Sequence, residues 1–158
     1  MNKRIKKKKQ REKNKKLCET YPFLIPRNRW TDQILWESKE KWYYTHPYSF
    51  TELDSMPRGW RKAFGESICR EIKEELIKHK YLNRYRILQI KEKYGELRWY
   101  DNGTPVKSKV HDIINKYTEL SRNTCILCGR PAKIINNNGW YEPICDICFK
   151  LYHTENAY

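Results

Sequence analysis

The sequence predicts an α+β fold in which two helices pack on a β-hairpin or a small antiparallel sheet. Two segments, 55–82 and 104–121, carry apolar residues at helical spacing, and the segment between them reads as two short strands around a tight turn. Two Cys-x-x-Cys pairs follow and predict a separate C-terminal unit over 124–150. At 158 residues, the chain has room for one domain with appendages rather than for two full domains.

The first segment, residues 1–16, is strongly basic. It holds ten Lys and Arg and one Glu, so that it carries +9 of the formal net charge of +14. With so few apolar residues it cannot bury a core, which predicts a disordered tail. Its cations are expected to bind nucleic-acid phosphates non-specifically, although a merely solubilising tail is also possible. The candidate contacts are Lys6, Lys7, Lys8, Lys9 and Arg11.

Residues 17–123 are expected to form the α+β domain. Its first part, 17–53, is rich in aromatic residues and contains three prolines, Pro22, Pro26 and Pro47. This composition predicts extended chain wrapped on the core, with at most a short helix or strand near 31–44 and an optional third strand from 20–50.

The first helical segment, 55–82, starts at Ser55-Met56-Pro57, which combines a capping residue with an early proline. Its apolar stripe consists of Ile68, Ile72, Leu76 and Tyr81. The strands 85–93 and 96–100 flank Tyr94-Gly95, a pair suited to a tight hairpin turn.

The second helical segment, 104–121, starts at Thr104-Pro105, again a cap followed by proline. Its expected buried face is Val106, Val110, Ile113, Ile114, Tyr117 and Leu120.

Trp60 and Trp99 are expected in the core with their Arg neighbours pointing outward. The alternative is that the basic–aromatic runs at 27–30, 58–61 and 98–100 stack on nucleic-acid bases.

The four C-terminal cysteines carry the clearest chemistry in the chain. Cys125, Cys128, Cys145 and Cys148 have the spacing C-x2-C-x16-C-x2-C, which is typical of a structural Zn2+ site in a zinc ribbon. A hairpin formed by 133–135 and 140–144 is expected between the two pairs, and residues 151–158 are expected to be a short tail. The alternatives are two disulfides or reduced core cysteines.

A catalytic role is not expected for this site, because four thiolates leave no open coordination position on the metal. The carboxylates at 71–75 and 92–96 are interleaved with bases and are explained by ion pairing. Sequence therefore favours a non-enzymatic protein.

Composition also restricts the cellular setting. No apolar run reaches the roughly 20 residues that a membrane helix needs, and the basic N-terminus lacks the apolar stretch of a signal peptide. Paired cysteines in such a chain favour a reduced, cytoplasmic compartment with no membrane partner.

Several blocks resemble a family of small phage and prophage proteins from gut-type bacteria. They are Tyr21-Pro-Phe-Leu, Met56-Pro-Arg-Gly-Trp60, Lys91-Glu-Lys-Tyr-Gly-Glu-Leu-Arg-Trp-Tyr100, Cys125-Ile-Leu-Cys-Gly-Arg-Pro131 and Gly139-Trp140. The resemblance spans about residues 20–150, and the block at 91–100 is its most specific part. It implies the order helix, hairpin, helix and four-cysteine unit, and a viral protein acting in a bacterial host cytoplasm. The basic tail is not part of it.

Two functions follow as hypotheses. The first is a zinc protein that binds nucleic acid through the tail and through Arg130 and Lys133 of the ribbon. The alternative is a phage-encoded interaction module that inhibits or modulates a host enzyme or defence complex, with the aromatic segment 30–48 as its contact surface.

Overall fold

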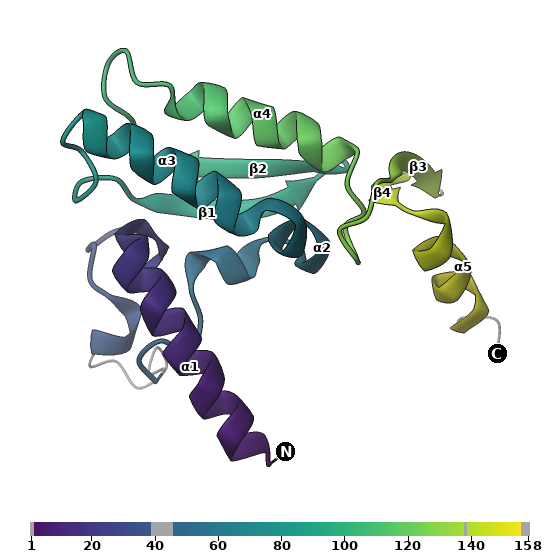
Figure 1. Cartoon of the computed structure of the whole chain (residues 1–158), viewed down its shortest axis with the longest axis horizontal. Helices are drawn as coiled ribbons and strands as arrows, with labels where there is room; N and C mark the ends of the chain where they lie inside the picture. Colours follow the sequence, from purple (N-terminus) through teal and green to yellow (C-terminus); the bar gives the residue numbers. More distant parts are fainter. Residues whose placement is uncertain (1, 39–45, 138, 156–158) are drawn as a thin grey trace.

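The computed structural model of the chain describes residues 2–38, 46–137 and 139–155. Helices α3 (Glu66–Lys78) and α4 (Val110–Arg122) lie side by side over a hairpin of β1 (Ile87–Lys93) and β2 (Glu96–Asp101) (Figure 1). The C-terminal unit follows α4 and stands to one side. The α+β architecture predicted from sequence is therefore confirmed.

The β1–β2 hairpin has the predicted turn. The strands are antiparallel, with Ile90 opposite Trp99 and Lys93 opposite Glu96. Tyr94 and Gly95 both have positive φ, 54° and 80°, as the tight primed hairpin turns require. One face of the hairpin contributes Ile90, Leu97 and Trp99 to the core.

Helix α3 buries three residues of the predicted stripe, since Ile68, Ile72 and Leu76 are fully buried. The helix ends at Lys78, before the predicted end at 82, so the fourth residue, Tyr81, lies outside it and is partly buried against the core. The segment before it is more broken than predicted. It consists of η4 (Glu52–Ser55), α2 (Arg58–Trp60) and one π-helical turn, η5 (Arg61–Gly65). The side chain of Asp54 caps η4 by accepting from the backbone N–H of Thr51.

Helix α4 starts at Val110, six residues later than the Thr104-Pro105 signal predicts. Lys107 has a φ of 67°, which breaks the helical path, and the backbone N–H of Lys109 donates to the carboxylate of Glu75 on α3. Val106, which was expected on the buried face, therefore lies before the helix and is exposed, and Leu120 near the end of α4 is exposed as well. The remainder of that face packs into the core as predicted.

The basic N-terminal segment differs most from the sequence prediction. Residues Lys3–Thr20 form helix α1 instead of a disordered tail. Lys, Arg, Gln and Glu are strong helix formers, and an argument from apolar content alone does not count that propensity. The helix is anchored at its C-terminal end, where Asn14 and Cys18 are buried and the Asn14 amide donates to the carbonyl of Tyr48.

The chain from 21 to 55 wraps the core without forming a named strand among its described residues. Arg27 and Ile34 form one isolated antiparallel bridge, and η1 (Pro22–Leu24) and η2 (Leu35–Glu37) are short 3₁₀ turns. The predicted third strand is thus absent from the described part of this segment. Residues 39–45, where part of the predicted element would lie, fall outside the described residues.

The core contains both predicted tryptophans. Trp60 is fully buried, and the Trp99 indole N–H donates to the hydroxyl of Tyr85 at 3.0 Å, which in turn donates to Asp101 at 3.0 Å. Cys69 is buried, as predicted. Across the described residues, no helix combines the length and apolar character that crossing a bilayer requires.

Candidate metal centre

The C-terminal unit contains the predicted hairpin and one more helix. Strands β3 (Lys133–Asn137) and β4 (Trp140–Ile144) pair antiparallel with Lys133 opposite Ile144. Helix α5 (Asp146–Glu155) follows at once, so the described part of the predicted 151–158 tail is helical. The hairpin and α5 bring the second cysteine pair back toward the first.

The four cysteines form one cluster. The sulfurs of Cys125, Cys128, Cys145 and Cys148 all lie within 4.8 Å of one another, and those of Cys128 and Cys145 are 3.6 Å apart. Sulfurs held at about 2.3 Å from one tetrahedral ion are about 3.8 Å apart, so this spacing fits a metal ion. All four cysteines are free rather than joined in disulfides.

The first pair sits in a turn that aims its sulfurs inward. The Cys125 N–H donates to the carbonyl of Arg130 at 2.7 Å, and the Gly129 N–H donates to the carbonyl of Cys125 at 2.9 Å. Gly129 has a φ of +82°, a conformation that glycine adopts without strain. Glycine at this position therefore allows the tight turn that follows the first cysteine pair.

The second pair is placed differently. Cys145 follows β4, whereas Cys148 lies in the first turn of α5, and the Phe149 N–H donates to the Cys145 carbonyl at 2.9 Å. The end of β4 and the first turn of α5 thus each bring one cysteine sulfur to the four-sulfur cluster.

The cluster changes the acidity of its thiols. Burial raises the pKa of the Cys125 thiol, but backbone hydrogen bonds from Cys145, Cys128 and Leu127 lower it to about 7. Burial and hydrogen bonds with neighbouring sulfurs raise the pKa of Cys148 to about 12. A bound cation would replace the protons on such thiols, because thiolates are the ligand form.

A contact that sequence reasoning missed joins the cluster to the core. The Gly59 N–H donates to the carbonyl of Ile126 at 2.8 Å, and the Trp60 indole N–H donates to the carbonyl of Thr124 at 2.8 Å. A Cβ added to Gly59 would lie 2.1 Å from the Cys125 carbonyl oxygen. The Gly59-Trp60 pair therefore forms a socket for the first cysteine turn.

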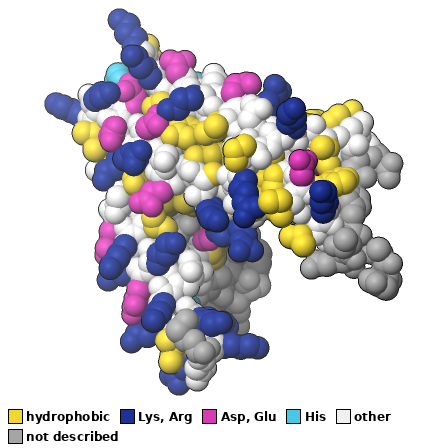
Figure 2. Space-filling view, turned by 45° about the vertical axis from the view of Figure 1, so that its right-hand side comes forward, with side chains coloured by type: hydrophobic (Ala, Val, Ile, Leu, Met, Phe, Trp, Pro, Cys, Tyr) yellow, Lys and Arg dark blue, Asp and Glu magenta, His cyan; other side chains and the backbone are white. Residues whose placement is uncertain are grey.

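The predicted nucleic-acid contacts fall into two separate groups. Lys6, Lys7, Lys8 and Lys9 are exposed on α1, with Arg11 half-buried, whereas Arg130 and Lys133 are exposed on the C-terminal unit. These two parts stand apart in Figure 1. In Figure 2, Lys and Arg gather along the arm that carries α1, and apolar side chains gather on the C-terminal unit.

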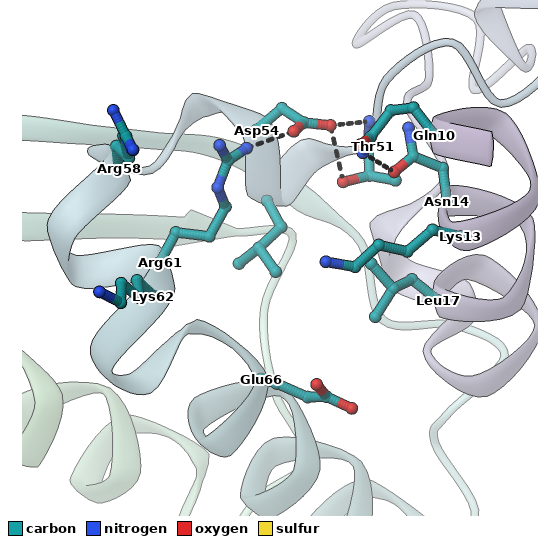
Figure 3. Close-up of a pocket in the computed structure, with 11 residues that line it drawn as sticks. Gln10, Lys13, Asn14, Leu17, Thr51, Asp54, Arg58, Arg61, Lys62 and Glu66 are labelled. Atoms are coloured by element: carbon teal, nitrogen blue, oxygen red, sulfur yellow. Dashed lines mark hydrogen bonds and ion pairs between the residues drawn. The ribbon is translucent and has the colours of Figure 1, made fainter. Parts of the chain in front are cut away.

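Further cations lie beside α1. A hollow of about 350 Å3 separates α1 from the η4–η5 segment, and Lys13 points into it (Figure 3). Arg58, Arg61 and Lys62 line its opposite side, with Arg61 paired to Asp54. The sequence did not indicate that these three basic residues lie near the basic N-terminal segment, because more than 40 residues separate the two groups in the chain.

No family model, curated protein or solved structure matches this chain.

Proposed function

We propose that the protein is a non-enzymatic zinc protein that binds nucleic acid non-specifically through its phosphates. Zinc is the ion that four clustered cysteine thiolates suit best, and a closed set of four sulfurs gives it a structural role. The setting implied by the family resemblance, a phage protein in a bacterial host cytoplasm, remains part of the proposal.

Helix α1 is the observation that carries the nucleic-acid proposal. It contains ten Lys and Arg and two Glu in 18 residues. Because Asn14 and Cys18 hold its C-terminal end in the core, the cations of its first turns are presented at defined positions. Like charges at this density repel one another along a helix, and bound phosphates relieve that repulsion.

The hollow beside α1 extends this cationic surface. Arg58 and Lys62 lie on the far side of it from Lys13, and the lining also contains Glu66 (Figure 3). Among the described residues, none of these three cations forms an ion pair with a carboxylate. Arg130 and Lys133 would supply a second, smaller contact on the C-terminal unit. A nucleic-acid strand that reaches both groups would bridge the two arms of the molecule.

The test compares two variants of equal charge. One replaces Lys6, Lys7, Lys8 and Lys9 with Gln, which preserves helix propensity, and the control replaces Lys80, Lys93, Lys107 and Lys109 with Gln. Binding of a labelled oligonucleotide is followed by fluorescence anisotropy over a range of salt concentrations. We expect the α1 variant to bind more weakly and to lower the slope of log K against log salt by up to about 3. Equal losses in both variants would show that net charge alone is responsible and would overturn the proposal.

A second function is favoured by a different observation. Of the fourteen large apolar side chains that are exposed among the described residues, seven lie between 127 and 151. They are Leu127, Ile134, Trp140, Tyr141, Ile147, Phe149 and Leu151. An apolar surface of this density is typical of protein-interaction sites, so it offers the interaction-module hypothesis a contact surface in addition to the segment 30–48, of which residues 39–45 lie outside the described residues.

This second function predicts that the protein binds a partner protein directly, so that the complex persists after nuclease treatment. The full chain and a Trp140→Ala/Ile147→Ser variant are used as baits in nuclease-treated bacterial lysate. A defined protein retained by the wild type and lost by the variant would support it. Equal recovery by both baits would contradict it.

A further inference from the structure

Trp30 is the most exposed large apolar side chain in the described part of the chain. Its exposed fraction is 92%, whereas Trp60 and Trp99 are buried. A solvent-exposed tryptophan ring is unusual, because its large apolar surface would stabilise the fold if it were buried in the core. The ring is available for contact with a ligand.

The loop that carries Trp30 is well ordered by hydrogen bonds. The Asn28 side chain accepts from the N–H of Trp30 at 2.8 Å and from the N–H of Thr31 at 3.1 Å. The Asn28 N–H donates to the carbonyl of Gln33 at 2.8 Å, next to the Arg27–Ile34 bridge. These contacts fix the backbone at Trp30, so the exposed ring is presented by a rigid support.

An arginine-lined hollow lies beside this loop. Its volume is about 250 Å3, and its lining includes four arginines from two separate segments of chain, Arg27, Arg29, Arg84 and Arg86. Asp32 is the carboxylate of this lining, and it pairs with Arg27 at 3.5 Å and with Arg86 at 3.2 Å.

The other two arginines are available to a ligand. Within the described residues, no carboxylate forms an ion pair with Arg29 or Arg84. Glu52 is close enough for Arg29 to act on its charge, but burial raises the pKa of Glu52 to about 7, so it is only partly ionised at neutral pH. The hollow therefore keeps an excess of positive charge.

The size and chemistry of the hollow suit a phosphate. Its volume of about 250 Å3 lies just below the roughly 300–1,000 Å3 of pockets that enclose drug-sized ligands, which suits a phosphate group whose attached base stays outside. Guanidinium forks bind phosphate oxygens in pairs. A base attached to that phosphate would remain outside the hollow. Trp30 does not line the hollow, but it directly follows the lining residue Arg29 and offers an exposed ring for that base.

We propose that the Trp30 loop and the arginine hollow form a binding site for single-stranded nucleic acid, with one base stacked on Trp30 and its phosphate held by Arg29 and Arg84. This inference rests on the proposed nucleic-acid function and names a site for it outside α1. Single strands are specified because stacking needs an open base face, which a duplex does not offer. Aromatic stacking accepts every base, so the site is not sequence-specific.

The experiment measures binding of a labelled dT12 strand and of a duplex of the same length to the full chain. Variants are Trp30→Ala, Trp30→Phe and Arg29→Gln/Arg84→Gln, with Val106→Ala as the control for loss of another strongly exposed apolar side chain. We expect Trp30→Ala to weaken dT12 binding about 5-fold or more and to leave duplex binding unchanged. Trp30→Phe should retain most of the affinity, and the double arginine variant should weaken dT12 binding.

The outcomes separate the two proposals. If the wild type binds neither oligonucleotide, the proposed function fails. If it binds both and Trp30→Ala matches the wild type on dT12, the stacking site is overturned while the proposed function stands. The nucleotide dTMP is the final probe: saturation by dTMP as tight as by dT12 would overturn the assignment to a strand and favour a free nucleotide.

Discussion

At the residue scale, Glu75 is a buried carboxylate with a structural task. It accepts hydrogen bonds from the backbone N–H of Lys109 at 2.9 Å and from the side chains of Lys78 and His79, each at 3.1 Å. The Lys109 hydrogen bond is the largest cause of its lowered pKa, about 2, followed by that from Lys78. The ionised carboxylate of Glu75 thus ties α3 to Lys109, the residue that precedes α4.

Glu75 predicts how stability depends on acid. Its pKa is lower in the folded chain than the ordinary 4.5, so the unfolded chain takes up this proton first as the pH falls. The stabilisation is complete above about pH 4.5 and is lost as the pH falls toward 2. Thermal unfolding of the wild type and Glu75→Gln should differ by a constant amount from pH 6 to 8, and the difference should shrink below pH 4.5. A difference that stays constant down to pH 2.5 would contradict this assignment.

Gly59 carries a second prediction at this scale. In Gly59→Ala the new methyl group would meet the Cys125 carbonyl oxygen at 2.1 Å, so the cysteine turn must move and its hydrogen bond to Gly59 is lost. We expect a destabilisation of about 2 kcal/mol, measured by denaturant unfolding. Gly65→Ala is the matched control, because there the tightest contact, 3.2 Å, is with the flexible side chain of Arg61. Similar effects of the two substitutions would show that the socket is unimportant.

At the element scale, the C-terminal unit has a small core beside its cysteine cluster. Few of its apolar side chains are buried; among them are Cys125 and Ile144. We expect a unit with so small a core to require a metal ion at the four cysteines to hold β3, β4 and α5 together.

Removing the ion should therefore unfold this unit first. We expect a strong chelator under reducing conditions to abolish hydrogen-exchange protection at Cys125, Ile126 and Gly129, whose N–H groups are bonded in the folded unit. Protection in α3 and in the β1–β2 hairpin should persist. Metal analysis of the untreated protein should give one zinc per chain. Unchanged exchange and unchanged melting in chelator would exclude a stabilising metal.

The elements also show which parts of the fold sequence reasoning can predict. Periodicity located the buried stripe of α3, and Tyr94-Gly95 located the hairpin, because both signals are local. The start of α4 was missed, since the N–H of Lys109 bonds to Glu75, 34 residues earlier. Helix α1 was missed for two reasons. Apolar content alone does not count the helix propensity of Lys, Arg, Gln and Glu, and the contact that anchors the helix joins Asn14 to the carbonyl of Tyr48, again 34 residues away.

The candidate metal site was likewise predictable only where its sequence signals are local. Cysteine spacing identified all four clustered ligands, since two short motifs suffice for that inference. The socket was not predictable, because 64 residues separate Trp60 from Thr124. Interactions over such separations leave no local pattern in a single sequence.

At the scale of the whole molecule, the socket makes the metal site and the core interdependent. The cysteine turn bonds to Gly59 and Trp60, and Trp60 is itself fully buried among core residues. Loss of the folded C-terminal unit should therefore lower the stability of the α+β domain without unfolding it.

A double-perturbation cycle tests this interdependence. Trp60→Phe removes the indole N–H that donates to Thr124 but retains an aromatic ring in the core. We expect chelation to reduce the free energy of unfolding of the domain less in Trp60→Phe than in the wild type, by about 1 kcal/mol, the value of one hydrogen bond. Trp99→Phe is the control: it also loses an indole hydrogen bond, but to Tyr85 within the core, so its effect should add to that of chelation. Denaturant unfolding monitored by circular dichroism, with and without chelator, measures all three chains. Additivity in Trp60→Phe as well would mean that the domain and the metal unit are energetically independent.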